Sequence, residues 1–573
     1  MEYSWKINPI NEQQKNEALQ LSQALKIDAV MARMLVQRSI TNAQQAQDFF
    51  RPSLEKLLDP FLMNDMEQAV ERLHEAILKH ENILVYGDYD VDGITAVALV
   101  YRFLSNLTKN LLFYIPDRYS EGYGISFQGI DFAHEKKCSL IIALDCGIKE
   151  MDKVEYATQK GIDFIICDHH LPKGDIIPNA VAVLDAKRND NTYPFTELSG
   201  CGVGYKFMCA YALKHKISLD AFDSLYELLA LSIAADIVPI VSENRILAYY
   251  GLKQINEHPC VGIQKLIDLS ALNGKNIDIH DLGFRLGPRI NASGRINLGI
   301  KAVHLLITSD NDEAAAYAKE IEEYNTERQT LQSSLYQEAV EHLKNDPNNA
   351  DKKTTVVYSP NWHRSVAGIV ASKLTETFYR PTIVLADFND ELISGSARSV
   401  GDFNIHDAIC ACSDLLTHFG GHHFAAGLSM KRENLELFQQ RFEEYVQTHI
   451  NQEQQNPTIN IEMELQLSDI TPRFVKFLYC LEPCGPENPA PLFVTRNLVN
   501  FKNTRRVGTN GEHLRVELTD GQNVISGIGF GMGDFAERIL KGEKIDVCYA
   551  VQENTFNGKT TTQMMIKDIH FKN

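Results

Sequence analysis

Three aspartates stand at every second position directly after a short apolar segment of the sequence. Residues 82–85 read Asn-Ile-Leu-Val, and Asp88, Asp90 and Asp92 follow within the run Tyr-Gly-Asp-Tyr-Asp-Val-Asp-Gly at 86–93. Residues two apart in an extended backbone point to the same side, so three carboxylates are expected on one face at a strand's end. Two such charges about 4 Å apart repel by about 4 kcal/mol at an effective dielectric of about 20. Cations must offset this repulsion, and oxygen ligands suit Mg²⁺ or Mn²⁺.

Further acidic and imidazole side chains follow other apolar segments. Asp145 comes after one such segment, and Asp168, His169 and His170 come after the next, while Asp236 ends a strongly apolar stretch. A histidine pair after a strand is uncommon, and Asp168 could orient one imidazole without contacting the metal itself. Delivered together, these residues predict a metal site.

Three alternatives apply to single members of this set. The pattern of 88–93 also occurs in calcium loops, but an EF-hand needs a preceding helix and a Glu where position 99 is Leu. A lone aspartate often serves as a turn residue or helix N-cap. A histidine can be a buried, hydrogen-bonded core residue. None of these alternatives explains the whole set.

The elements that must position the set alternate between strand and helix from residue 82 to about 240. This alternation predicts a parallel α/β sheet, and ligands in such sheets bind outside the carboxyl ends of the strands. The acidic motifs fall at those ends. The expected strands are 83–86, 111–115, 140–144, 164–167 and 180–184, with helices over 94–106, 151–160 and 224–235.

The rest of the chain predicts further units, since 573 residues are too many for one core. The absence of Gly and Pro between 310 and 345 predicts one long helix with an apolar stripe, able to bridge two domains. A second α/β unit comes next, with a glycine-rich turn at Gly420-Gly421, and then a polar linker at 451–457. Five or six β-rich segments in the last part suit an OB-like barrel. The expected domains are 1–75 (a helical lobe packed on the adjoining α/β domain), 76–245, 246–350, 351–455 and 456–573.

Composition restricts the partners and the compartment. A net charge of −19 argues against indiscriminate coating of nucleic acid, although residues 498–573 are nearly balanced, with ten basic and nine acidic side chains. Nucleic-acid contacts must then come from local grooves and depend on salt. Eleven cysteines without paired zinc spacing favour reduced thiols. No apolar run is long enough to span a membrane and no signal peptide is apparent, so a cytoplasmic location is expected.

The motifs resemble those of a known family. The run 87–93, Asp145 and the Asp168-His169-His170 triplet are similar to the signature of the DHH phosphoesterase superfamily, and residues 420–427 to the glycine-histidine motif of its associated second domain. Residues 288–295 and 481–489 resemble elements of the RecJ family of single-strand-specific 5′→3′ exonucleases. The resemblance extends over about residues 15–570.

This resemblance implies a set of two divalent ions, Mn²⁺ or Mg²⁺, and the residues around them. Many relatives carry His where this chain has Tyr86, and a phenol is a poor replacement, so Tyr86 is not expected among the ligands. Two ions about 3.5–4 Å apart would clamp a phosphodiester and activate water. The implied catalytic residues are Asp90, Asp92, Asp145, His169, His170 and Asp236, and the implied ligands are Asp88, Asp90, Asp92, Asp145, His169 and Asp236. Whether Asp88 and His170 contact metal directly stays open.

The resemblance also implies a pocket for a terminal 5′-phosphate, which guanidinium groups hold well. The alternative for each arginine is a surface or interdomain ion pair, and for the histidine pair a packing motif. The implied substrate residues are Arg118, Asn291, Arg295, Arg328, Ser396, Arg398, His422 and His423. Weaker candidates for contacting single-stranded DNA are Arg505, Arg506 and Arg515, with Phe501 expected in the core rather than on a stacking surface.

The sequence therefore predicts an exonuclease that degrades single-stranded DNA 5′→3′ to nucleoside 5′-monophosphates in repair and recombination. A helicase and a single-strand-binding protein are the expected protein partners, and a monomer is the default. Two other functions remain possible: an enzyme for short oligonucleotides, cyclic dinucleotides or pyrophosphate, and a non-enzymatic scaffold that binds single strands. The N-terminal lobe and residues 456–573 favour a long substrate, and the complete ligand set argues against a scaffold.

Overall fold

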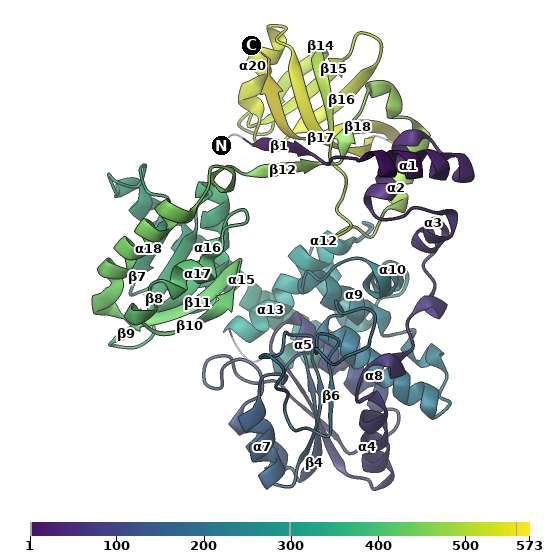
Figure 1. The fold of residues 1–573 in the computed structure, drawn as a ribbon, viewed down its shortest axis with the longest axis vertical. Helices are drawn as coiled ribbons and strands as arrows, with labels where there is room; N and C mark the ends of the chain where they lie inside the picture. The colour runs from purple at the N-terminus through teal and green to yellow at the C-terminus, as the bar shows by residue number, and fades with distance from the viewer. Residues whose placement is uncertain (1–2, 297–298, 557, 573) are drawn as a thin grey trace.

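The computed structural model describes residues 3–296, 299–556 and 558–572. Figure 1 shows a parallel α/β unit at the bottom, a second α/β unit in green at the left and a β-barrel in yellow at the top. Within the described ranges, no helix combines the length and apolar character needed to cross a membrane.

The first unit is built on a parallel five-stranded sheet with the order β3-β2-β4-β5-β6. Both faces are covered, which explains why its strands read as continuous apolar runs. Helices α4, α5 and α8 cover one face, and α6 and α7 cover the other. The strands are β2 (Asn82–Gly87), β3 (Leu111–Tyr114), β4 (Cys138–Leu144), β5 (Asp163–Cys167) and β6 (Ala182–Leu184). The helices are α4 (Met66–Leu78), α5 (Val91–Leu104), α6 (Phe127–Glu135), α7 (Met151–Gln159) and α8 (Gly200–Lys214).

Helices dominate the next segment and end in the predicted long helix, α15 (Asn311–Asn345). Its 35 residues correspond to about 52 Å. Ile321 lies in the core of the first unit and Leu335 in that of the second, so the predicted apolar stripe joins two domains. The preceding helices are α9 (Tyr226–Ala235), α10 (Ser242–Glu257), α11 (Val261–Leu269), α12 (Ile279–Asp281), the π-helical turn Leu282–Leu286, α13 (Gly287–Ile296) and α14 (Ile300–Ile307).

The second α/β unit has a mixed sheet with the order β10-β11-β9-β8-β7, in which only β7 and β8 are parallel. The predicted glycine-rich turn was wrong: Gly420 and Gly421 pair with Gly427 and Ala426 inside the β10–β11 hairpin. A side chain at Gly421 would lie 2.5 Å from the Ala425 carbonyl oxygen, so glycine permits the close pairing. The elements are β7 (Thr355–Ser359), α16 (Arg364–Phe378), β8 (Thr382–Asp387), β9 (Leu392–Arg398), α17 (Ile405–Cys410), β10 (Leu416–His422), β11 (Ala425–Lys431) and α18 (Leu435–His449).

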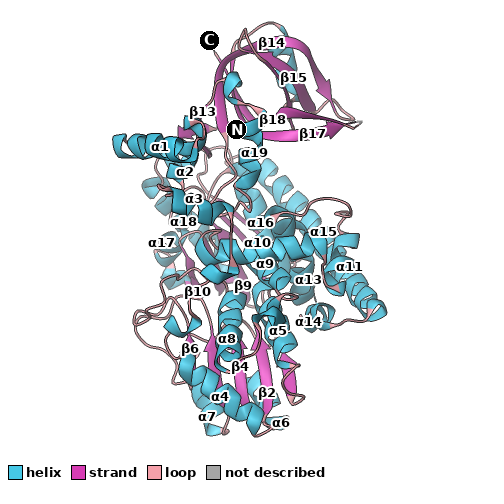
Figure 2. Cartoon of the chain, turned by 90° about the vertical axis from the view of Figure 1, so that its right-hand side faces the viewer, coloured by secondary structure: helices cyan, strands magenta, loops and turns pink. Residues whose placement is uncertain are grey.

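The C-terminal unit is the predicted OB-like barrel, with five long strands in the order β14-β15-β16-β18-β17, closed by pairing of β14 with β17. Only β16 and β18 pair in parallel within this ring. Figure 2 shows strands of this unit curling into a barrel at the top of the view. The elements are β13 (Met463–Glu464), α19 (Pro472–Cys480), β14 (Phe493–Val507), β15 (His513–Thr519), β16 (Val524–Gly529), α20 (Ala536–Leu540), β17 (Ile545–Phe556) and β18 (Lys559–Phe571).

The N-terminal segment is divided between two cores instead of forming one lobe packed on the adjoining α/β domain. The strand β1 (Ser4–Ile7) pairs in parallel with β12 (Thr458–Ile461) beside the barrel (Figure 1). Buried residues of α1 (Glu12–Leu25), α2 (Ala29–Gln37) and α3 (Ala43–Phe50) join the barrel core, whereas α4 packs on the first sheet. The amphipathic pattern of these helices gave no indication of which distant surface they would cover.

Candidate active site

Carboxylates and imidazoles from separate stretches of the chain meet at the carboxyl ends of β2, β4 and β5. We call this set the acid cluster. In each of three overlapping groups, potential ligand atoms lie within 4.8 Å of one another. The groups are Asp88, Asp90 and Asp145; Asp92, His169 and Asp236; and Asp145, His169 and His170.

The three aspartates at 88–92 converge for a different reason from the predicted one. Asp90 still has extended backbone, but α5 begins at Val91, so Asp92 lies in the helix and not in the extended segment. Asp90 is the N-cap of α5 and accepts hydrogen bonds from the backbone N–H groups of Asp92 (3.0 Å) and Gly93 (3.2 Å). A side chain at Gly93 would lie 2.4 Å from the Asp88 carbonyl oxygen, so glycine allows the helix to start this close to the strand. The prediction of one extended face was therefore wrong, although the carboxylates do meet.

Asp92 is fixed from the far side of the acid cluster. Its carboxylate accepts hydrogen bonds from the N–H groups of Gly200 (2.7 Å) and Cys201 (2.8 Å) at the start of α8, and from Ser232 Oγ (2.7 Å). A helix N-terminus stabilises a negative charge placed on it. Asp92 is thus buried and held at one position.

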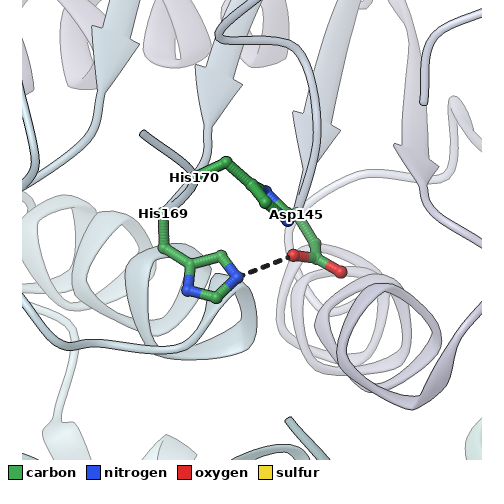
Figure 3. A group of neighbouring side chains, drawn as sticks. All are labelled: Asp145, His169 and His170. Carbon is green, nitrogen blue, oxygen red and sulfur yellow. Dashed lines mark ion pairs between the residues drawn. The ribbon is translucent and has the colours of Figure 1, made fainter. Parts of the chain in front are cut away.

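Asp145 and His169 face each other in the centre of the site. Asp145 Oδ1 lies 3.2 Å from His169 Nε2, the pair drawn with a dashed line in Figure 3. His169 Nε2 also lies 3.6 Å from Asp236 Oδ2 and 3.7 Å from Asp92 Oδ2. Asp145 has a φ of 59°, in the left-handed region that non-glycine residues rarely adopt. Asp236, the C-cap of α9, thus reaches the site as predicted from the apolar helix before it.

His170 is held by a charged partner. Its Nδ1 lies 2.7 Å from Asp168 Oδ1, and its Nε2 lies 3.0 Å from the Tyr123 hydroxyl. Burial alone would raise the pKa of Asp168, but the hydrogen bond and charge of His170 and the Ile148 N–H lower it to about 2. Burial opposes a positive His170, yet Asp168 raises the pKa of His170 to about 9. The contact with Asp168 therefore favours the protonated form of His170.

The remaining members repel one another strongly without a cation. Burial and the charge of Asp90 raise the pKa of Asp88 to about 8, and burial with Asp92 raises that of Asp236 to about 8. Burial and neighbouring carboxylates also raise the pKa values of Asp90 and Asp145. Burial lowers the pKa of His169, which leaves a neutral imidazole with a free lone pair.

Several buried atoms of the acid cluster have no hydrogen-bond partner in the described part of the chain: both carboxylate oxygens of Asp88, Oδ1 of Asp145 and both ring nitrogens of His169. Buried polar atoms are normally satisfied, so an absent ligand is the simplest reason for this arrangement. Mostly carboxylate donors with one neutral imidazole fit Mn²⁺ or Mg²⁺. Tyr86 stays outside the cluster, as expected: its ring is buried on the opposite face of the sheet, and its hydroxyl donates to the Gly124 carbonyl oxygen at 3.0 Å.

A second concave site lies between the two α/β units. A cavity of about 250 Å³ is lined by guanidinium, hydroxyl and small groups and by no carboxylate among the described residues. We call it the arginine cavity. A side chain at Gly368 would lie 2.9 Å from a terminal nitrogen of Arg398, so glycine leaves room for that guanidinium. The lining residues are Arg118, Arg295, Arg364, Ser365, Gly368, Ile369, Ser372, Ser396 and Arg398.

The structure brings four of the predicted 5′-phosphate residues into this cavity, namely Arg118, Arg295, Ser396 and Arg398, and places the others elsewhere. Arg328 is buried and bonded to Asn325 (2.8 Å) and Gln332 (2.9 Å). Asn291 accepts a hydrogen bond from the Val91 N–H (3.2 Å), beside the acid cluster. His422 ends β10 on the surface, and His423 Nε2 lies 3.0 Å from Asp402. A contact of these residues with substrate stays a prediction.

On the barrel, the predicted arginines lie on neighbouring strands. Arg505 of β14 pairs with Arg515 of β15, and both are exposed. Arg506 forms an ion pair with Asp534 at 2.9 Å. The expectation that Phe501 belongs to the core was wrong, because 45% of its surface is exposed.

Sequence reasoning missed three residues at these sites. Arg364 lines the arginine cavity from the first turn of α16, and no motif pointed to it. Tyr123 contacts His170 from a loop between two glycines. Asp185 follows the apolar strand β6, the same signal that identified Asp145, and burial together with Asp168 raises its pKa to about 7.

Comparison with known proteins agrees with this arrangement. Residues 82–233 match the DHH family N-terminal domain, residues 351–448 the DHHA1 domain, and residues 461–568 the RecJ OB domain. The fold and the acid cluster thus define a phosphoesterase of the DHH class.

Named relatives identify the family within this class to which the chain belongs. The chain is 35% identical over 560 residues to the single-stranded-DNA-specific exonuclease RecJ of Bacillus subtilis, covering 98% of this chain and 70% of the relative. It is 30% identical to the Escherichia coli RecJ, covering 94% and 95%. The crystal structure of Thermus thermophilus RecJ in complex with Mn²⁺ superposes with a TM-score of 0.84 at 26% identity, covering 99% and 80%. The chain belongs to the RecJ family.

Proposed function

We propose that this chain is a metal-dependent exonuclease that degrades single-stranded DNA from its 5′ end and releases nucleoside 5′-monophosphates, in repair and recombination. The observation that carries the proposal is the pairing of two sites, the acid cluster and the arginine cavity, in a chain of the RecJ family. One site suits the phosphodiester to be cut, and the other suits a terminal phosphate.

Asp88, Asp90, Asp92, Asp145, His169 and Asp236 are the proposed ligands of the divalent ions. When bound, such ions supply Lewis-acid activation of water and stabilise charge on the phosphate oxygens. The protein's own part is to hold Asp92 through α8, to keep His169 neutral, and to keep His170 cationic through Asp168. A cationic His170 offsets charge that develops on the non-bridging oxygens.

The arginine cavity is proposed to bind the 5′-phosphate and so to set the direction of degradation. Guanidinium forks and hydroxyl groups are the usual donors to phosphate. Arg398 is half-buried and donates to the Ala397 carbonyl oxygen at 2.8 Å, which keeps its guanidinium in the cavity wall. Arg398→Ala is expected to slow digestion of 5′-phosphorylated strands more than that of 5′-hydroxyl strands.

The barrel is proposed to extend the path of the strand through Arg505, Arg515 and the exposed ring of Phe501. Aromatic rings and cations bind single strands without reading sequence. Replacing both arginines by Glu is expected to weaken DNA binding and reduce its salt dependence. Interaction with a helicase and a single-strand-binding protein, a monomeric state and a cytoplasmic location belong to the same proposal.

Three labelled substrates test the function: a single strand, the matching duplex and a dinucleotide. With Mn²⁺, the purified chain is expected to release mononucleotides from a 5′-phosphorylated single strand, and to leave the matching duplex largely intact. Asp145→Ala and EDTA are expected to abolish release. Digestion that starts at the 3′ end, equal cleavage of the duplex, or a preference for a dinucleotide over the long strand would contradict the proposal.

A further inference from the structure

The arginine cavity carries more positive charge than one terminal phosphate can balance. Its wall contains four guanidinium groups, from Arg118, Arg295, Arg364 and Arg398, and no carboxylate among the described lining residues. A terminal phosphate brings about −1.5 to −2 at neutral pH. About two positive charges are then left without a counter-charge in a partly desolvated space.

Two carboxylates, Glu327 and Asp387, share a cavity wall with Arg295 and Arg364, but neither forms an ion pair with these arginines. In the described part of the chain, none of the four arginines forms an ion pair. Burial, together with the charges of Arg118 and Arg328, lowers the pKa of Arg295 to about 10. Arg364 has its guanidinium over the Phe388 ring, 4.5 Å from the centroid, a contact that leaves its N–H donors free.

The arginine cavity also adjoins further open space, beyond the volume that one phosphate group occupies. A second cavity of about 410 Å³ shares Arg295 and Arg364 with the arginine cavity, so these two side chains stand where the two spaces join. It contains two carboxylates, and one of them, Asp387, is already paired with Arg432 at 2.7 Å. A longer anionic group is therefore expected to end at Arg295 and Arg364 and not to extend deeper.

We propose that the arginine cavity accepts single strands with a 5′-triphosphate, and that Arg364 binds the phosphoryl groups beyond the first. This inference rests on the proposed binding of a 5′-phosphate in the cavity. A triphosphate brings about twice the negative charge of a monophosphate, which matches four guanidinium groups.

The reaction on such an end needs only water. The water oxygen forms a bond to the phosphorus between the first and second nucleotides, the bond from phosphorus to the first 3′-oxygen breaks, and a water proton passes to that oxygen. The first product is a nucleoside 5′-triphosphate, and the shortened strand carries a 5′-monophosphate. Every later cut releases a nucleoside 5′-monophosphate, so each strand yields one triphosphate.

Three strands of the same sequence test this inference, with a 5′-hydroxyl, a 5′-monophosphate or a 5′-triphosphate. Binding is measured by fluorescence anisotropy in EDTA, and products by chromatography with Mn²⁺. The triphosphate strand is expected to bind about tenfold more tightly than the monophosphate strand. Arg364→Ala is expected to remove this difference between the triphosphate and the monophosphate strand.

A second variant separates a local effect from a general loss of positive charge. Lys373 lies on α16, as Arg364 does, and its ammonium lies over the Tyr336 ring. The Lys373→Ala variant is expected to bind all three strands like the wild type. Equal binding of mono- and triphosphate strands, absence of a nucleoside triphosphate product, or an Arg364→Ala variant that keeps the preference would overturn the inference. Failure to prefer the monophosphate over the hydroxyl strand would instead count against the proposed 5′-phosphate site.

Discussion

Adding a single methyl group at Gly200 should reduce the cleavage rate strongly while the protein still folds. It starts α8, donates its N–H to Asp92 and stands directly beside Asp145. An added Cβ would lie 2.6 Å from Asp145 Cβ and 2.8 Å from its Cα. Carbon atoms in contact are about 3.5 Å apart or more, so Asp145 or the helix must move by about 1 Å.

That movement should reduce the rate strongly while leaving the protein folded. A misplacement of about 1 Å in a catalytic group can reduce kcat about 100-fold, equivalent to about 2.7 kcal/mol. Overpacking costs about 1–3 kcal/mol of unfolding free energy, and the better helix propensity of Ala returns up to about 1 kcal/mol. Gly200→Ala is therefore expected to fold and to lose most of its activity.

Single-turnover cleavage of a 5′-phosphorylated strand with saturating Mn²⁺ measures the rate, and urea unfolding measures stability. Gly202→Ala is the matched control, because its added Cβ would meet its nearest neighbours at 3.4 Å, an ordinary contact. This control should keep its activity. A Gly200→Ala protein that cleaves at the wild-type rate would refute the reasoning that the position of Asp145 limits the chemistry.

Three further predictions concern charge and domain attachment. Asp88 and Asp236 have pKa values raised to about 8 in the folded protein, from about 3.9 in the unfolded chain. Between these two pH values the metal-free folded protein therefore binds more protons than the unfolded chain. Its unfolding free energy falls as pH rises through this window. Thermal unfolding in EDTA should show a lower Tm at about pH 8 than at about pH 5. Added Mn²⁺ should raise the Tm more at the higher pH. A Tm in EDTA that does not change with pH would contradict this. Asp168→Asn should lower the pKa of His170 from about 9 towards its ordinary value, measured by NMR of the imidazole, whereas an unchanged pKa would exclude Asp168 as the cause. Arg245→Ala should lower the unfolding free energy by about 1–3 kcal/mol, because it removes the hydrogen bonds from Arg245 to the carbonyl oxygens of residues 481–483, although Asn488 still donates to those of Leu481 and Pro483; an unchanged urea midpoint would contradict this.

The parallel sheet could be predicted because its signal is local. Each strand is a short apolar run that ends in a turn, and burial on both faces leaves no polar alternation to confuse with a helix. The long helix α15 was predictable for a similar reason, since its apolar stripe continues across both domain cores. Convergence of Asp145 and His169 followed from the topology, because neighbouring parallel strands end at the same edge.

The features that could not be predicted depend on contacts between distant segments. The spacing of Asp88, Asp90 and Asp92 fits an extended strand as well as a strand-to-helix turn, and the N-cap role of Asp90 decided between them. Gly420-Gly421 fits a turn by composition, but pairing with β11 made it strand. Arg364 gave no signal at all, since the arginine cavity forms only where residues of the first α/β unit and of α13 meet α16.

Helix α13 links the two sites that the proposed reaction requires. Asn291 accepts the Val91 N–H beside the acid cluster, and Arg295, four residues later, lines the arginine cavity. Residues four apart lie on the same face of a helix, about 6 Å along its axis. Release of single nucleotides demands that the terminal phosphate and the next phosphate be held at a fixed separation, and one short rigid helix between the sites can set it. In the proposed reaction α13 would set the length of the product, while the barrel and the second α/β unit would select the strands and 5′ ends that reach it.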